Sequence, residues 1–245
     1  MSAALALLAV AGGSTLQRLT GMGFALVAAP ALVLLLDPVE GVLVTNAGAS
    51  LAALLLFVKL RGAVDWRRLT YLLPAALAGI APGAWVALTV PAPVLDVVVG
   101  VAVIGGISAS FVAARVGEMR GRGPMIGLGF ASGFMNVSAG VGGPALSVYG
   151  VASRWAQVSF AATLQPLFLA MGVVSLAAKW WGGGADVATQ PWWLWAGVAA
   201  TVVLGVVVGS RLAPRVSAGQ ARTLVIVIAY VGGVATLVRG VAALW

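Results

Sequence analysis

Residues 136–144 combine an amide, a hydroxyl group, three glycines and a proline within an otherwise apolar region. Glycine and proline interrupt helices, and a backbone group freed in hydrocarbon is costly unless protein, water or a ligand satisfies it. We therefore expect this break to face the protein interior. A helix that starts there would present unpaired N–H groups and partial positive charge, and glycine would let a ligand approach them closely. These residues could bind an oxyanion.

A second break of similar character, residues 17–24, lies about half a chain upstream. Two such breaks facing each other would form a cradle for an anion, with Arg18 as an intramembrane counter-charge. Arg18 could instead extend to an interface, and Asn46 and Gln165 could instead make interhelical hydrogen bonds. The candidate substrate-binding residues are Arg18, Thr20, Gly21, Gly23, Asn46, Asn136, Ser138, Gly140, Gly142, Gly143 and Gln165.

The composition indicates what surrounds these residues. The chain of 245 residues is 62% hydrophobic and 8% charged. Because a soluble domain has about 25% charged residues, this composition predicts an all-α integral membrane protein. The net charge is +8, but the basic residues lie in short segments between apolar runs, where they set orientation in the membrane. We expect a small anion and the lipid bilayer as partners and no nucleic acid, and a homo-oligomer stays open.

The composition also excludes most catalytic chemistry. Cysteine and histidine are absent, which removes thiolate nucleophiles, imidazole bases and the usual zinc sites. The six acidic residues fall at the ends of apolar segments or between them, so no buried carboxylate proton relay is expected. We predict no enzyme activity, no metal and no cofactor. The N-terminus lacks a basic region before its apolar run, so we interpret it as the first membrane segment.

The apolar segments predict how the two breaks are held. As one straight helix, residues 1–36 would measure about 54 Å, against a hydrocarbon core of about 30 Å. We expect them to fold at residues 21–23 into a hairpin, either as two short spans or as a re-entrant pair. A second hairpin is expected at 124–152, and spans are expected at about 41–58, 69–90, 95–114, 155–178, 192–210 and 223–244.

The halves of the chain can be overlaid as repeats, 1–115 and 124–245, joined by a cytoplasmic linker at 116–123. A basic loop precedes the third element of the first half and follows it in the second, so inverted topology is expected. Each repeat would hold a Gly-broken helical hairpin plus three transmembrane helices, as in secondary transporters that bind substrate near the midplane. The matched positions are Gly21 with Gly140, Asn46 with Gln165, and Gly79 and Gly83 with Gly205 and Gly209.

Basic residues predict the orientation of the chain. By the positive-inside rule, the loop between the first two spans, the linker and the loop after 192–210 are cytoplasmic. Both termini are then expected outside the cytoplasm, in a multi-pass protein of the inner (plasma) membrane. A cluster with Lys179, Asp186 and four tryptophans follows the span 155–178 and is expected to form an external interfacial belt. The four glycines at 79, 83, 205 and 209 are expected to serve close helix packing.

Two motifs open the two halves of the chain. The first reads Gly-Met-Gly-Phe at 21–24, followed by Pro-Ala-Leu at 30–32, and the second reads Ser-Ala-Gly-Val-Gly-Gly-Pro-Ala-Leu at 138–146. Together they resemble the TauE/SafE sulfite exporter family of membrane transporters, although Phe24 stands where that family often has glycine. The resemblance implies a secondary transporter of sulfite, sulfoacetate or related sulfonates across the inner membrane. A non-transporting membrane scaffold or subunit, and an anion channel, are the alternatives.

Overall fold

The computed structural model describes residues 2–115, 119, 121–182 and 192–245, which form helices and no strand. The helices are α1 (Ser2–Thr20), α2 (Gly23–Leu35), α3 (Pro38–Leu60), a 3₁₀ turn (Arg61–Ala63), α4 (Trp66–Thr89), α5 (Ala92–Ala113), α6 (Arg122–Ala139), α7 (Gly143–Ala152), α8 (Gln157–Trp181), α9 (Trp192–Leu212) and α10 (Ala218–Ala242). Within the described ranges, six helices, α3–α5 and α8–α10, are long and apolar enough to cross a membrane. The prediction of an all-α integral membrane protein is confirmed.

Two helical hairpins accompany the long helices. The first joins α1 to α2 through Gly21, whose φ is 88°, and the second joins α6 to α7 through Gly140, whose φ is 73°. Glycine adopts these left-handed conformations without the strain that a side chain would add. The second arms, α2 and α7, have 13 and 10 residues, so they are about 20 and 15 Å long. Neither second arm is long enough to cross a hydrocarbon core of about 30 Å alone.

Polar residues set where the long helices begin. The carboxylate of Asp37 caps α3 by accepting hydrogen bonds from the N–H groups of Val39 and Glu40, both at 2.9 Å. Asp65 caps α4 by accepting from the N–H of Arg68 at 3.0 Å. Ser217 and Gln220 form a capping box that caps the N-terminus of α10. These caps satisfy N–H groups that a helix leaves free at its start.

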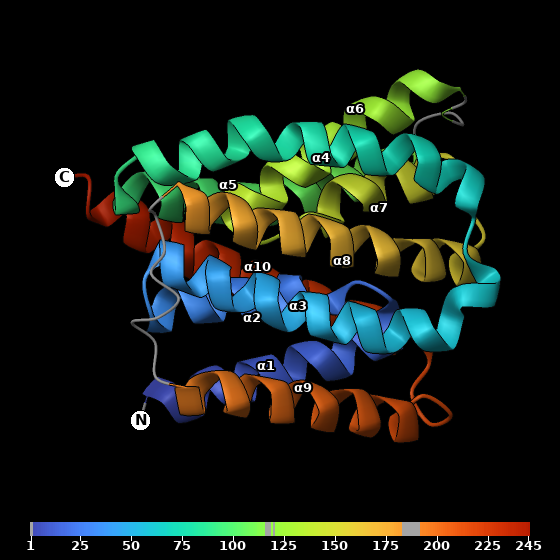
Figure 1. Cartoon of the computed structure of the whole chain (residues 1–245), viewed down its shortest axis with the longest axis horizontal. Helices are drawn as coiled ribbons and strands as arrows, with labels where there is room; N and C mark the ends of the chain where they lie inside the picture. The colour runs from blue at the N-terminus through green and yellow to red at the C-terminus, as the bar shows by residue number, and fades with distance from the viewer. Residues whose placement is uncertain (1, 116–118, 120, 183–191) are drawn as a thin grey trace.

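The first arm of each hairpin packs closely on a long helix from the other half of the chain. Figure 1 shows α1 along α9, and α6 likewise packs on α4. A Cβ added at Gly205 would lie 2.6 Å from the Cβ of Ser14, and one at Gly83 would lie 2.7 Å from the carbonyl oxygen of Phe134. Glycine therefore lets these backbones approach, as small residues do between membrane helices. The other matched glycines at these two interfaces are Gly79 and Gly209.

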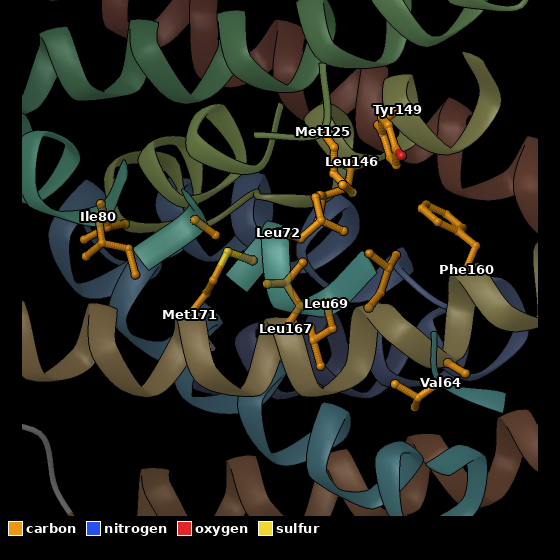
Figure 2. Packing of buried hydrophobic residues seen from close by; sticks show 14 of the residues in the cluster. Val64, Leu69, Leu72, Ile80, Met125, Leu146, Tyr149, Phe160, Leu167 and Met171 are labelled. Carbon is orange, nitrogen blue, oxygen red and sulfur yellow. The ribbon is translucent and has the colours of Figure 1, made fainter. Parts of the chain in front are cut away.

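An apolar cluster joins the second hairpin to α4 and α8 (Figure 2). Leu146 and Tyr149 of α7 pack there against Leu72 of α4 and against Leu167 and Met171 of α8. In lipid, such packing stabilises chiefly through van der Waals contact, because the lipid tails are as apolar as leucine. The cluster fixes α7, and with it the second glycine break, relative to the long helices.

An ion pair joins α5 and α10 at the end of the bundle where both termini lie (Figure 1). Arg239 donates hydrogen bonds to both carboxylate oxygens of Asp96, at 2.8 and 2.6 Å. It also donates to the carbonyl oxygens of Val33 and Leu34, at 2.9 and 3.2 Å. The Asp96 side chain is 7% exposed and the Arg239 side chain 33%. The pair thereby also holds the C-terminal end of α2.

Lys179 does not lie where the sequence predicts. Instead of belonging to an external loop, it lies in the last turn of α8, which continues to Trp181, and it is only 1% exposed. The apolar run therefore extends past the predicted boundary at 178, and Trp180 and Trp181 provide its exposed end. Asp186 of the predicted belt, and Glu118 and Arg120 of the predicted linker, lie outside the described residues.

Candidate functional site

The N-terminal turns of α2 and α7 lie next to each other. Met22, the N-cap residue of α2, faces the start of α7: a Cβ added at Gly143 would lie 3.7 Å from the Cβ of Met22. The hydroxyl group of Ser147, one turn further along α7, donates a hydrogen bond to the Met22 sulfur at 2.9 Å. A Cβ added at Gly140 would lie 3.4 Å from that of Ala29 in α2. The two glycine breaks are thus brought together.

Both helices begin without a side-chain cap. The N-cap residues are Met22 and Gly142, and neither makes a capping hydrogen bond through its side chain. Uncapped N-termini carry partial positive charge and leave N–H groups available. Two of them directed to one region can stabilise an anion.

Gln165 of α8 holds the turn of the first hairpin. Its Nε2 donates to the carbonyl oxygens of Gly21, at 2.9 Å, and Ala161, at 2.7 Å. Its Oε1 accepts from Nε2 of Gln17 at 3.1 Å. The side chain is 0% exposed, and an amide has only two N–H donors. Gln165 therefore has no donor left for an anion. In this conformation it makes interhelical hydrogen bonds, the alternative to substrate binding that the sequence left open.

A matching set of hydrogen bonds holds the second hairpin. Nδ2 of Asn46 donates to the carbonyl oxygen of Asn136 at 3.4 Å, and Ser175 donates to Oδ1 of Asn136 at 2.9 Å. Ser132 donates to the carbonyl oxygen of Gly142 at 2.8 Å. Carbonyl oxygens at the second break thus accept from side chains of α3 and α6, and Ser175 of α8 holds the side chain of Asn136.

A cavity of about 20 Å³, the small cavity, lies where the breaks meet. Gln17, Asn46 and Asn136 line it together with the first residues of α2 and α7. Oε1 of Gln17 and Oδ1 of Asn46 are buried and have no hydrogen-bond partner in the described structure. This volume holds about one water molecule, so the expected anion cradle is closed in this conformation.

A second cavity of about 550 Å³, the large cavity, lies on the other side of Met22. Its size is typical of small-molecule sites, which measure about 300–1,000 Å³. Thr20 and Ser147 are polar groups of its wall, and the exposed residues Arg154 and Arg222 place its mouth at the surface. Among the described residues, Met22 alone lines both cavities. Met22 therefore lies between them.

Arg18 lies away from both cavities. Its Nε donates to the hydroxyl group of Ser210 in α9 at 3.0 Å, beside Gly209. Of the other candidate residues, Asn46, Asn136, Gly142 and Gly143 line the small cavity and Thr20 lines the large one. Those that line neither are Gly21, Gly23, Ser138, Gly140 and Gln165.

Sequence reasoning missed several residues of this region. Ser132 was missed although it lies four residues before the candidate Asn136 and so shares one face of α6 with it, a spacing that could have indicated a polar face turned inward. Gln17 lies one helical turn before the break at Gly21, and its polar side chain in an apolar helix could likewise have indicated an inward-facing position. Arg154 and Arg222 were not among the candidate residues, because no sequence pattern shows that they border one cavity.

Comparison with known proteins identifies the family. A family model described as sulfite exporter TauE/SafE matches residues 5–236, which include both hairpins. No curated protein and no solved structure matches the chain. Members of the matched family are membrane transporters and not enzymes. With nearly the whole chain covered, the protein belongs to the TauE/SafE sulfite exporter family.

Proposed function

We propose that the protein is a secondary transporter of small sulfur-containing anions, such as sulfite, sulfoacetate or related sulfonates, across the inner membrane. One observation carries the proposal: Met22 lies between a cavity that reaches the surface and a small cavity lined by three amide side chains and two uncapped helix N-termini. The N-termini supply N–H donors and positive potential for an anion. A barrier between an open cavity and a closed site is what alternating access requires.

In the proposed cycle, the anion reaches Met22 through the large cavity. Displacement of Met22 and a shift between α2 and α7 enlarge the small cavity, and the anion binds there beside Asn136. The unpaired oxygens of Gln17 and Asn46 accept hydrogen bonds from water or from a protonated anion. A proton could thus travel on the substrate itself.

We further propose that residues 1–115 and 124–245 are inverted repeats joined by a linker at 116–123. The packing of the glycines supports this arrangement, because each half places its hairpin on helices of the other half. Gly106 of α5 lies against Pro144 of α7, and Gly232 of α10 lies against Pro30 of α2. In the same way, α1 of the first half packs on α9 of the second, and α6 of the second half packs on α4 of the first.

The mouth of the large cavity is proposed to face the cytoplasm, with both termini on the opposite side. The basic residues at the mouth support this orientation through the positive-inside rule. Both termini lie at one end of the bundle and the connection between α3 and α4 lies at the other (Figure 1). An outward movement of anions is then favoured by a membrane potential that is negative inside.

The experiment is uptake of ³⁵S-labelled sulfite into proteoliposomes, combined with labelling of Ser147→Cys. Because the chain has no cysteine, a membrane-impermeant thiol reagent would report on this position alone. We expect saturable uptake, and we expect Ser147→Cys to react only from the face that carries Arg154, at a rate that sulfite lowers. Met22→Trp should abolish uptake by blocking the passage between the cavities, whereas Met22→Ala should retain it.

The outcomes separate the alternatives. Flux that does not saturate would favour an anion channel. A folded protein that transports neither sulfite nor sulfoacetate, with or without a pH gradient or membrane potential, would favour the non-transporting scaffold. Reaction of Ser147→Cys from the opposite face would reverse the proposed orientation.

A further inference from the structure

We propose that Arg154 and Arg222 form an anion-recruiting site at the mouth of the large cavity, which binds a sulfite or sulfonate group before it reaches Met22. The inference rests on the proposed transport function and assigns a site outside the two glycine breaks. Both side chains are exposed, and both line the large cavity. Arg154 follows α7, and Arg222 comes from α10, so the site joins two helices distant in sequence.

The backbone of Arg154 gives the first argument. Its φ is 49°, and it is the only residue other than glycine with a positive φ among the described residues. The N–H groups of Arg154 and Trp155 donate to the carbonyl oxygens of Val151, at 3.1 Å, and Gly150, at 3.0 Å. Glycine usually occupies this position after a helix, because a side chain is strained there. An arginine in a strained conformation beside a cavity indicates a functional constraint.

The charge balance gives the second argument. Among the residues that the structure describes, no aspartate or glutamate lines the large cavity, and neither guanidinium group makes an ion pair or hydrogen bond with any of them. By contrast, Arg68 pairs with Asp65 and Arg239 pairs with Asp96. The donors of Arg154 and Arg222 therefore stay available, in the fork geometry that matches an oxyanion.

Arg222 lies at the positive end of a helix. It occupies the second turn of α10, near the N-terminus of that helix. The macrodipole adds positive potential where the guanidinium group already supplies charge. Both contributions favour an anion as the partner of Arg222.

Aromatic and cation–π contacts surround Trp155, the residue after Arg154. The ring of Trp155, which lines the cavity, lies edge-on to Tyr149 and Phe160, with ring centroids 6.0 and 5.4 Å apart. The guanidinium carbon of Arg68 lies 4.3 Å from the centroid of the Trp155 ring. These contacts hold the chain next to Arg154.

The test compares Arg154→Gly, Arg154→Lys and Arg222→Gln in proteoliposomes, with Arg215→Gln as the matched control. Arg215 is an exposed arginine outside both cavities. We expect KM for sulfite to rise about tenfold in Arg154→Gly and in Arg222→Gln, which corresponds to about 1.4 kcal/mol, while the maximal rate changes little. Arg154→Lys keeps the charge and should retain most of the affinity. Arg215→Gln should leave KM unchanged.

Thermal unfolding separates this role from misfolding. Glycine adopts a positive φ without strain, so Arg154→Gly should unfold at the same temperature as the wild type or higher, even as its KM rises. Added potassium chloride should raise the wild-type KM through screening, which acts over about 10 Å at 0.1 M. The variant that lacks both arginines should show a weaker dependence on salt.

Several results would overturn the site. Saturable wild-type uptake with KM unchanged in Arg154→Gly and Arg222→Gln would remove it and leave the transport proposal standing. If the wild type shows no saturable uptake, equilibrium binding of labelled sulfite to the solubilised protein decides. Binding that Arg154→Gly weakens supports the site, and no binding by the wild type refutes it. Labelled phosphatidylglycerol that binds the wild type, binds Arg154→Gly more weakly and is not displaced by sulfite would assign the arginines to a lipid headgroup instead.

Discussion

Replacement of Gln165 by leucine tests whether this residue holds the first hairpin or binds substrate. The change removes the donor to the carbonyl oxygen of Gly21 and the acceptor for Gln17. Both groups then stay buried without a partner, since Gln165 is fully buried in contact with them. The matched control is Gln157→Leu, in the same helix. Gln157 is exposed and reaches the same turn only through a 3.4 Å hydrogen bond to the carbonyl oxygen of Thr20.

The expected magnitude follows from the two lost hydrogen bonds. Interhelical hydrogen bonds in membranes contribute about 0.6 kcal/mol on average, and a buried group left unpaired costs about 1–3 kcal/mol. We expect Gln165→Leu to lower the free energy of unfolding by about 2–3 kcal/mol. For a chain of this size, that corresponds to a fall of about 4–12 °C in the unfolding temperature. Gln157→Leu should change the free energy of unfolding by less than about 0.5 kcal/mol.

The assay is thermal unfolding of the solubilised protein, followed by tryptophan fluorescence, together with sulfite binding. Equal unfolding temperatures for Gln165→Leu and Gln157→Leu would refute the structural role of Gln165. A Gln165→Leu variant that unfolds like the wild type but no longer binds sulfite would show that Gln165 contacts the substrate.

Three further predictions use the same unfolding assay. Arg239→Met should lower the free energy of unfolding by about 3–5 kcal/mol, because it leaves Asp96 buried and unpaired. Adding Asp96→Leu should recover at least half of that loss. A larger loss in the double variant than in Arg239→Met would contradict this account of the ion pair. Gly133→Ala should destabilise the protein by about 1–3 kcal/mol through overpacking, because the added Cβ would meet the carbonyl oxygen of Ala76. The control Gly127→Ala places its Cβ in open space and should stabilise the protein by about 0.5–1 kcal/mol. Stability changes of the same sign in both variants would count against the packing of α6 on α4. Gly140→Ala should lower the free energy of unfolding by about 1–2 kcal/mol because of the left-handed backbone at this position. Gly143→Ala should lower it less, because its Cβ would lie in ordinary contact with Met22. Equal losses of stability would show that the left-handed backbone is not the reason why glycine is needed at position 140.

Much of the fold was predictable because the membrane imposes simple rules. Long apolar runs must form helices there, and the breaks at Gly21 and Gly140 follow from residues that cannot continue a helix without cost. The end of α8 was less predictable. A buried lysine in the last turn looks, in sequence, like the first residue of a polar loop, so Lys179 was assigned to the wrong environment.

The candidate site was less predictable than the fold. Asn46 and Gln165 were selected as polar residues in apolar helices, but sequence cannot show that both donors of Gln165 are already used by carbonyl oxygens. Arg18 was selected for its charge, yet its partner Ser210 lies in a helix remote in sequence. The proposed barrier at Met22 left no sequence signal, because its role depends on the two cavities between which Met22 lies.

Counterflow in proteoliposomes tests the central claim most directly. Vesicles loaded with unlabelled sulfite or sulfoacetate receive labelled sulfite outside, with wild type, Gly142→Leu and Gly127→Leu compared after folding is verified. A Cβ at Gly142 would lie 2.9 Å from the carbonyl oxygen of Ser132, whereas one at Gly127 meets nothing within 4 Å. We predict transient accumulation of label, driven by the internal anion, in the wild type and in Gly127→Leu but not in Gly142→Leu. Label that enters equally well without internal anion, or counterflow that survives Gly142→Leu, would contradict a transporter that works through the two glycine breaks.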